Sequence, residues 1–289
     1  MSRVRAALAA LLTSAIVFPL TAQQMDPPGG SLVIVGGAMR DTAIVRRFLD
    51  LAGGPDAPIV LIPTAGGADS YDQAWEGGRL FRALGATRLT VLHTYDRGEA
   101  DTEAFAAPLR DARGVWFGGG RQWRLADSYL GTRVHQALRA ILARGGVVGG
   151  SSAGATILGS YLARGDTRDN TTMMGDHTEG LGFLTSVAID QHLLRRNRQF
   201  DLLEIVEARP DLLGIGIDEN TAIVVRGEEF EVIGESYAVI YDAQRRIGER
   251  GGFAFLAPGD RFHLRTRTAS RPRGQGDPLQ RYQRIEDKP

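Results

Sequence analysis

A serine framed by two glycines is the residue in this sequence whose setting best fits covalent chemistry. Ser152 lies in Gly150-Ser151-Ser152-Ala153-Gly154-Ala155, between the apolar run 146–149 and the helix-like segment 156–158. The pattern predicts a strand, a sharp turn and a helix. Glycines two residues before and after the serine remove Cβ atoms that would clash where the backbone doubles back. Such a turn, a nucleophile elbow, would expose the Ser152 hydroxyl, although glycine-rich strand–helix turns also cradle phosphates or only pack tightly.

A serine hydroxyl becomes a nucleophile only when a base takes its proton and a third group orients that base. The sequence has five histidines, and His192 has the best position for the base. It follows the apolar segment 187–189 in Asp190-Gln191-His192, so its side chain can reach over the end of a strand. The other histidines are predicted at a strand end, in a helix, in a polar loop and near the chain end: His93, His135, His177 and His263.

Acyl transfer also needs two N–H donors for the developing oxyanion. The Ala153 amide directly follows the serine at a helix N-terminus, where partial positive charge favours an anion. Gly119 or Gly120, in the glycine run 118–120, would supply the second donor, because a carbonyl can approach a residue without a side chain. The alternative for this run is a tight turn with no further role.

Apolar strand-like runs alternate with helical patterns in the first half of the chain. Strands are predicted at 32–37, 58–63, 88–92, 114–117 and 147–148, and helices at 42–52, 70–84, from about 123, and at 133–143. Uninterrupted apolar strands separated by helices indicate an α/β fold with a mostly parallel, doubly wound sheet. Ligands bind such sheets at the carboxyl ends of the strands, where the glycine turns and Ser152 are expected to meet.

Shorter, closely spaced strand patterns follow residue 215 and predict an antiparallel extension of the same sheet. The predicted organisation is a signal peptide at 1–22, a linker at 23–30, a single catalytic α/β domain at 31–265 and a flexible polar tail at 266–289. The signal prediction rests on Arg3 and Arg5 followed by an apolar stretch and small residues near 21–24. We therefore expect an exported protein, periplasmic or extracellular, without a membrane span after processing.

The composition limits the chemistry. The chain has 289 residues, 43% of them hydrophobic, which is enough for a full core, and a formal net charge of zero, which gives no nucleic-acid footprint. With no cysteine, disulfides, thiol nucleophiles and cysteine zinc sites are excluded. A nucleophile must then be an oxygen or nitrogen group, and the mechanism expected here needs no metal and no organic cofactor.

Four motifs occur in order and at compatible spacing. They are Phe117-x-Gly119-Gly120-x-Gln122, the Ser152 hexapeptide, Asp190-Gln191-His192 with trailing arginines, and Gly216-Ile217-Asp218-Glu219-x-Thr221-Ala222. Together, over roughly residues 31–245, they resemble the cyanophycinase branch of the serine peptidase family that also contains aspartyl dipeptidase. The resemblance implies a class I glutamine-amidotransferase-like fold and hydrolysis of β-linked Asp-Arg units of cyanophycin, or of peptide bonds after an N-terminal aspartate. A homodimer is compatible with that fold, and a non-catalytic binding protein on the same fold is the alternative from another class.

The resemblance also implies roles for individual residues. Ser152 would be the nucleophile, His192 the base and Glu219 the orienting acid, with three aspartates of the polar segment after the elbow as alternatives for the acid: Asp166, Asp169 and Asp176. The substrate pocket would contain Gln122, Asp190, Gln191, Arg196 and Arg198. Two positions depart from the family pattern: Ser151 replaces a threonine, and a further arginine is missing where Gln199-Phe200-Asp201 stand. The missing arginine favours a shorter aspartyl peptide as the alternative substrate.

Overall fold

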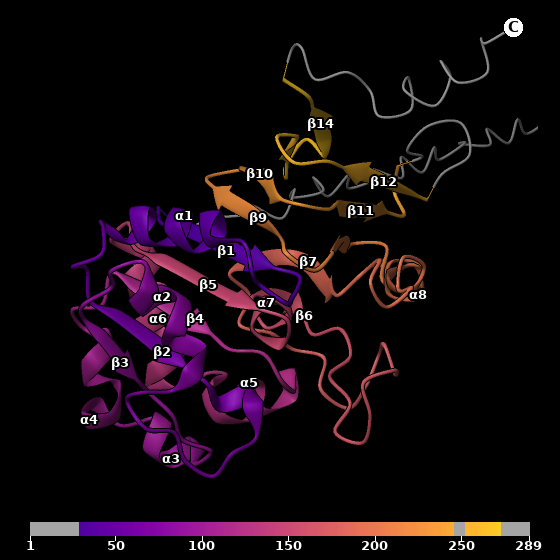
Figure 1. Ribbon diagram of the computed structural model, residues 1–289. Coiled ribbons are helices and arrows are strands. Elements are labelled where there is room, and N and C mark those ends of the chain that lie inside the picture. The colour runs from indigo at the N-terminus through magenta and orange to yellow at the C-terminus, as the bar shows by residue number, and fades with distance from the viewer. Residues whose placement is uncertain (1–28, 246–251, 273–289) are drawn as a thin grey trace, which may run out of the picture.

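A computed structural model describes residues 29–245 and 252–272 (Figure 1). The predicted signal peptide, most of the predicted linker and residues 273–289 of the predicted tail lie outside this part. Within it, the prediction of an α/β fold is confirmed. No helix among these residues has the length and apolar character needed to cross a membrane.

The larger of two sheets has nine strands in the order β14-β13-β10-β9-β1-β5-β4-β2-β3. Its parallel part consists of β1 (Ser31–Val35), β2 (Ile59–Ile62), β3 (Leu89–Val91), β4 (Gly114–Phe117) and β5 (Val147–Ser151). The antiparallel part adds β9 (Thr221–Arg226), β10 (Glu229–Gly234), β13 (Arg261–His263) and β14 (Thr268–Ser270). All five predicted parallel strands are therefore present.

Helices cover both faces of the parallel part, because alternate strand residues point to opposite sides. On one face Val33 and Trp116 pack in a core with α1 (Thr42–Ala52), and on the other Ile34 and Phe117 share a core with α5 (Gln122–Tyr129) and α6 (Arg133–Ala143). The shorter helices are α2 (Arg79–Ala83), α3 (Arg97–Ala100), α4 (Glu103–Ala106), α7 (Ala153–Thr156) and α8 (Asp201–Ala208), with 3₁₀ turns at Thr64–Gly66, Glu76–Gly78 and Ala107–Leu109.

The helix predicted over 70–84 is wrong for most of its length, since only Arg79–Ala83 is α-helical. The Asp72 side chain accepts a hydrogen bond from the Ala74 amide at 2.9 Å, which forms a local turn that competes with a helix. The glycine pair at 77–78 then lies in a 3₁₀ turn, in keeping with the low helix propensity of glycine.

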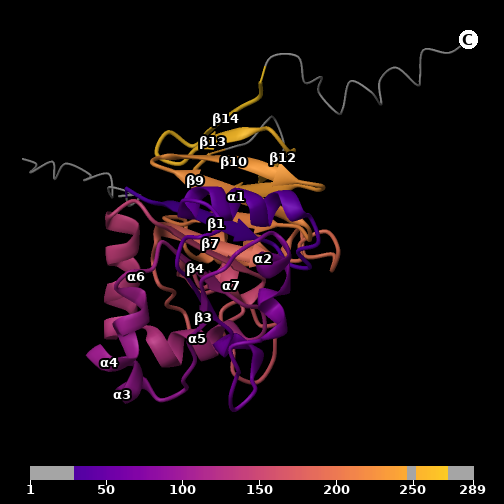
Figure 2. The ribbon, with the colours of Figure 1, turned by 60° about the vertical axis from the view of Figure 1, so that its left-hand side comes forward.

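A second sheet corrects the prediction that the later strands extend only the first one. It has five strands in the order β12-β11-β8-β7-β6: β6 (Gly159–Tyr161), β7 (Leu184–Gln191), β8 (Leu213–Ile217), β11 (Ala238–Asp242) and β12 (Phe253–Leu256). The chain enters the first sheet after β8 and returns to the second at β11, so the antiparallel extension is divided between the two sheets (Figures 1 and 2). Periodicity marks strands but not the sheet that each one joins.

The predicted flexible tail begins too early. Residues Thr268–Ser270 form β14, which pairs with β13 through Arg261–His263. Arg271 then donates to both carboxylate oxygens of Asp260 at 2.7 Å. The segment is polar because β14 is an exposed edge strand, and sequence polarity alone does not separate such a strand from a loose end.

Candidate active site

Ser152 lies at a strained turn between β5 and α7. Its backbone has φ 57° and ψ −117°, and its amide donates to the Val35 carbonyl of β1 at 3.0 Å. A Cβ at Gly150 would lie 2.2 Å from the Gly154 carbonyl oxygen, and a Cβ at Gly154 would lie 2.3 Å from the Phe117 carbonyl oxygen. The two glycines are therefore sterically required, as the sequence predicts, and they hold the serine at the tip of the turn.

The glycine run after β4 lies directly beside this serine. A Cβ built on Gly119 would be 3.7 Å from Ser152 Oγ, and one on Gly120, whose φ is 142°, would be 1.9 Å from the Ala65 carbonyl oxygen. Among the hydrogen bonds of the described residues, none uses the amide of Gly119, Gly120 or Ala153. These three amides are therefore free of protein acceptors in the described structure, and their role as an oxyanion hole stays a prediction.

His192 contacts the serine from the end of β7. Its Nε2 lies 2.9 Å from Ser152 Oγ, and its own amide donates to the Gly36 carbonyl at 2.7 Å. The imidazole packs on Gly37, where any Cβ would lie 2.2 Å from the ring. The serine hydroxyl and the imidazole are thus within hydrogen-bond distance without any rearrangement.

Glu219 completes the line on the far side of the imidazole. Its Oε1 lies 2.7 Å from His192 Nδ1, and its side chain is 17% exposed. It lies in the turn between β8 of the second sheet and β9 of the first. A carboxylate there accepts the Nδ1–H and so fixes Nε2 as the nitrogen that faces the serine.

The three alternative aspartates all bond within their own loop. Asp166 accepts from the Arg168 amide at 2.8 Å, Asp169 from the Thr171 amide at 2.6 Å, and Asp176 from the Thr167 hydroxyl at 2.6 Å. None of their described contacts reaches His192. Glu219 is therefore the carboxylate that contacts the histidine.

Opposing effects act on the His192 pKa. Burial lowers it below the ordinary value of 6.5, the hydrogen bond with Glu219 raises it, and the positive charge of Arg196 lowers it. The net direction is downward. The imidazole therefore stays neutral, and able to accept a proton, at pH values where an exposed histidine begins to be protonated.

Asp190 does not line an open pocket, which corrects the role predicted for it. Its side chain is fully buried, and its two oxygens accept from Arg164 at 2.8 and 3.1 Å. Arg164, 3% exposed, also pairs with Asp201 and donates to the Asn170 carbonyl at 2.8 Å. The result is a buried cluster, the Arg164–Asp190–Asp201 network, that joins the loop after β6 to β7 and α8. A charge this deeply buried must be paired, so Asp190 acts inside the protein.

Gln122 is likewise an internal residue. It is 1% exposed, and its Nε2 donates to the carbonyls of Ala163 and Arg164, both at 2.8 Å. It therefore anchors the start of α5 to the segment that carries the network, rather than presenting its amide N–H groups to a ligand. Gln191 is 5% exposed, and its Oε1 accepts from Arg198 at 3.1 Å.

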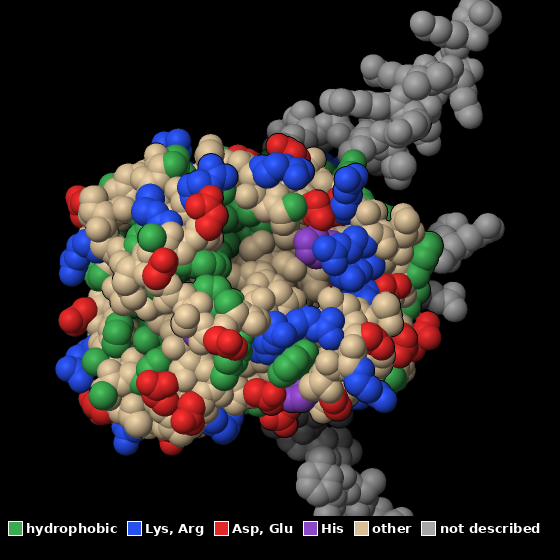
Figure 3. Space-filling view, turned by 60° about the horizontal axis from the view of Figure 1, so that its bottom comes forward, with side chains coloured by type: hydrophobic (Ala, Val, Ile, Leu, Met, Phe, Trp, Pro, Cys, Tyr) green, Lys and Arg blue, Asp and Glu red, His purple; other side chains and the backbone are tan. Residues whose placement is uncertain are grey.

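The two predicted substrate arginines differ in their surroundings. The Arg198 side chain is 11% exposed and donates to the backbone and side-chain oxygens of Gln191, both at 3.1 Å, and burial lowers its pKa. Arg196 is exposed, one turn after His192, and its amide donates to the His192 carbonyl at 3.0 Å. Figure 3 shows a hollow face with a histidine and basic side chains together on its rim.

Three further residues position the site without having been predicted. Asp218 accepts the amides of Leu194 and Arg195 at 3.0 Å, which fixes the turn after His192. Asn220 accepts the amides of Arg40 and Asp41 at 2.8 and 2.7 Å and so ties the acid turn to the loop after β1. Arg164 is the third. For Asp218 and Asn220 the sequence offers a signal, because they flank the predicted acid Glu219. For Arg164 no neighbouring motif indicates a role in the site.

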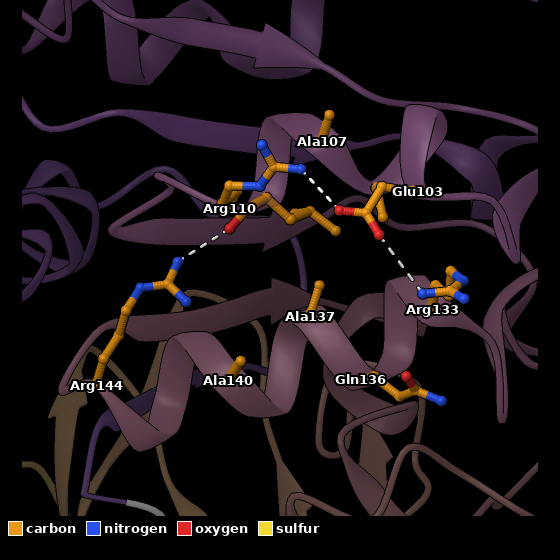
Figure 4. A pocket seen from close by; sticks show the side chains of 10 residues that line it. Glu103, Ala107, Arg110, Arg133, Gln136, Ala137, Ala140 and Arg144 are labelled. Carbon is orange, nitrogen blue, oxygen red and sulfur yellow. Dashed lines mark hydrogen bonds and ion pairs between the residues drawn. The ribbon is translucent and has the colours of Figure 1, made fainter.

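Two cavities lie elsewhere and are not lined by Ser152, His192 or Glu219. One of about 320 Å³ lies between α4 and α6 and is lined by alanines, Arg110, Arg133, Arg144 and Glu103 (Figure 4). Another of about 380 Å³ lies beside α5 and is lined by Asp127, Asp176 and His177 among others. Within the described residues, no group of three or more histidines, aspartates or glutamates is arranged to hold a metal ion.

An α/β fold with a serine, a histidine and a carboxylate in line at the strand ends is typical of hydrolases. The family model of peptidase family S51 matches residues 32–233, so the chain belongs to that family and is a peptidase. It is 33% identical to a cyanophycinase of Trichormus variabilis over 263 residues, covering 82% of this chain and 87% of that one. It is 34% identical to a cyanophycinase of Geminocystis herdmanii over 224 residues, covering 74% and 81%.

Two solved structures share the fold. The crystal structure of a peptidase from an acI-B1 Actinobacterium has a TM-score of 0.65 and 24% identity, covering 83% of this chain and 98% of that one. A putative peptidase E protein from Listeria monocytogenes has a TM-score of 0.52 and 21% identity, covering 72% and 99%. These structures support the fold, and the family model with the cyanophycinase relatives confirms the family resemblance noted in the sequence.

Proposed function

We propose that this peptidase is an exported serine-type hydrolase that cleaves aspartyl peptide bonds through an acyl-Ser152 intermediate. The observation that carries the proposal is the continuous line of hydrogen-bonding groups from Ser152 Oγ through His192 to Glu219, at 2.9 and 2.7 Å. In the first step Ser152 attacks the scissile carbonyl while its proton passes to His192 Nε2. The amides of Ala153 and of Gly119 or Gly120 stabilise the oxyanion.

The proton then passes from His192 to the leaving amine, and the carbon–nitrogen bond breaks. Water attacks the acyl-serine with His192 again as base, which releases the acid product and restores the serine. The Glu219 carboxylate stabilises the imidazolium that forms in each half-reaction. A fluorophosphonate probe should label Ser152, and a non-catalytic binding protein on this fold should remain unlabelled.

The substrate we propose is cyanophycin, from which the enzyme would release β-Asp-Arg. Support comes from the cyanophycinases among its relatives and from the exposed guanidinium of Arg196 near His192, which suits a substrate carboxylate. Short aspartyl peptides are the second candidate. One observation favours them: Asp201 stands where the family resemblance implies an arginine, and its carboxylate is paired with the buried Arg164.

The decisive experiment is incubation of purified cyanophycin with residues 23–289, beside the Ser152→Ala variant, with products identified by mass spectrometry. Release of β-Asp-Arg by the wild-type protein alone would support both the serine mechanism and the polymer substrate. Turnover of short aspartyl peptides without release from the polymer would support the second candidate. No turnover of either substrate, with no fluorophosphonate labelling, would contradict the proposed function.

Export can be tested separately. If residues 1–22 are a signal peptide, mass spectrometry of the mature protein from the periplasm or the medium should find an N-terminus near Gln23. A full-length protein confined to the cytosol would contradict export. Homodimer formation stays a prediction from the sequence, to be checked by light scattering of the purified protein.

A further inference from the structure

Two arginines that the proposed mechanism does not use lie on the oxyanion-loop side of Ser152. Arg121 follows Gly120 directly, and Arg124 is in the first turn of α5. We call Arg121 and Arg124 the loop-side arginines, and Arg196 and Arg198 the base-side arginines. Figure 3 shows basic side chains gathered at two separate places around one hollow, one of them beside a histidine.

Chain geometry places the loop-side pair close to the reacting serine. The Cβ position of Gly119 is 3.7 Å from Ser152 Oγ. Two extended residues span at most about 7 Å, and three helical residues rise about 4.5 Å, so both arginines begin within side-chain reach of a bound substrate. The base-side arginines follow His192 in the chain, and His192 contacts Ser152 from the end of β7. They therefore approach the serine from another side than the loop-side arginines.

Arg124 is held in a defined position. Its Nη1 donates to the Ala65 carbonyl at 3.2 Å, and its guanidinium lies 5.2 Å from the centre of the Trp123 ring. Gly67 makes room for it, because a Cβ there would lie 2.1 Å from Nη1. The hydrogen bond and the cation–π contact limit the movement of the charged group without neutralising it, in the space that Gly67 leaves open.

Neither loop-side arginine is paired with a carboxylate in the part of the chain that the structure describes. Arg124 donates to the carbonyl of Ala65, and the Arg121 side chain donates to the Asp166 carbonyl at 3.5 Å. Both are half-buried. Arg164, by contrast, is paired with two carboxylates. A guanidinium has five N–H donors, so the loop-side pair keeps donors free for an anion.

We propose that the loop-side arginines form a second carboxylate-binding subsite of the active site. It holds a carboxylate on the side of the scissile bond opposite the one held by the base-side arginines. This inference rests on the proposed function, and it defines the substrate more narrowly: one anionic group on each side of the bond that is cleaved. Successive units of a β-Asp-Arg polymer meet that requirement, because each keeps the free carboxylate of its arginine.

The test measures binding rather than turnover, in the Ser152→Ala background. Isothermal titration would compare a two-unit fragment, (β-Asp-Arg)₂, with the same fragment whose second-unit carboxylates are carboxamides. We expect the carboxylate form to bind roughly tenfold more tightly. Adding Arg124→Gln or Arg121→Gln should remove most of this preference and leave the affinity for the carboxamide form unchanged.

Arg110→Gln is the matched control, since it removes the same charge from an exposed arginine beside the separate cavity of Figure 4. It should change neither affinity. Equal binding of the two fragments, or an equal loss for both fragments in Arg124→Gln, would overturn the subsite, as would no binding at all. If the binding preference depends on Arg124 but the protein with Ser152 intact hydrolyses neither cyanophycin nor short aspartyl peptides, the subsite is kept and the proposed function is overturned.

Discussion

The two sheets hold their parts of the site by different physical means. The nine-stranded sheet positions Ser152 sterically: glycines at 150 and 154 stand where side chains would clash with the backbone. The five-stranded sheet positions His192 by polar contacts, through the Arg164–Asp190–Asp201 network and the Asp218 carboxylate. The nucleophile therefore depends mainly on side chains that are absent, whereas the base depends on charges that must stay paired and also on the space that Gly37 leaves for its ring.

Glu219 lies where the two sheets meet, so its substitution should have the largest effect on the base side. Glu219→Gln keeps the size of the side chain but removes the charge that stabilises the imidazolium, and we expect kcat to fall roughly 10⁴-fold. Because the bond to Glu219 raises the His192 pKa, its weakening should move the acid limb of the kcat/KM profile to lower pH. Stopped assays with high enzyme concentration would measure both.

Asp176→Asn is the control for that experiment, since Asp176 is an alternative acid whose hydrogen bonds within the described residues go to Thr167 and His177. The kcat of this variant should remain within a few-fold of the wild-type value. Near-wild-type activity of Glu219→Gln together with a loss in Asp176→Asn would transfer the orienting role to the polar loop.

The same contrast explains what could be predicted from the sequence. A steric requirement selects glycine, so the turn at Ser152 could be predicted from its two glycines, and the five parallel strands could be predicted from local apolar patterns. The polar network could not, because Arg164 lies 26 residues from Asp190 and 37 from Asp201, and nothing local links them. Asp190 and Gln122 were therefore predicted at the substrate, although both are buried among internal partners. The division into two sheets was missed because strand periodicity carries no information about pairing partners.

Breaking the network should affect stability before chemistry. Arg164→Met removes the cation between Asp190 and Asp201 and leaves a fully buried carboxylate without its main partner. We expect the free energy of unfolding to fall by about 3–5 kcal/mol, measured by urea denaturation. Arg79→Met is the matched control, because its side chain is 69% exposed and its ion-pair partner Glu76 is 80% exposed, and it should change stability by less than about 0.5 kcal/mol.

A double variant sharpens the interpretation of that loss. Arg164→Met combined with Asp190→Asn removes the uncompensated charge together with its partner, so part of the stability should return. If the double variant is less stable than Arg164→Met by the full cost of a second independent change, the penalty arises from lost packing. Ion pairing in the network would then contribute little to the free energy of unfolding.

Arg196→Gln should have the smallest effect and shift the pH profile in the opposite direction to Glu219→Gln. Arg196 is exposed, and its positive charge lowers the His192 pKa, so its removal should move the acid limb of kcat/KM to higher pH. The loss of a charge-assisted contact should lower kcat/KM for an anionic aspartyl substrate by roughly tenfold, mostly through KM. The exposed neighbour Arg195 serves as control, and Arg195→Gln should leave the acid limb in place. Equal shifts in both variants would mean that the base senses the overall charge of this turn, and that Arg196 has no specific position in the site.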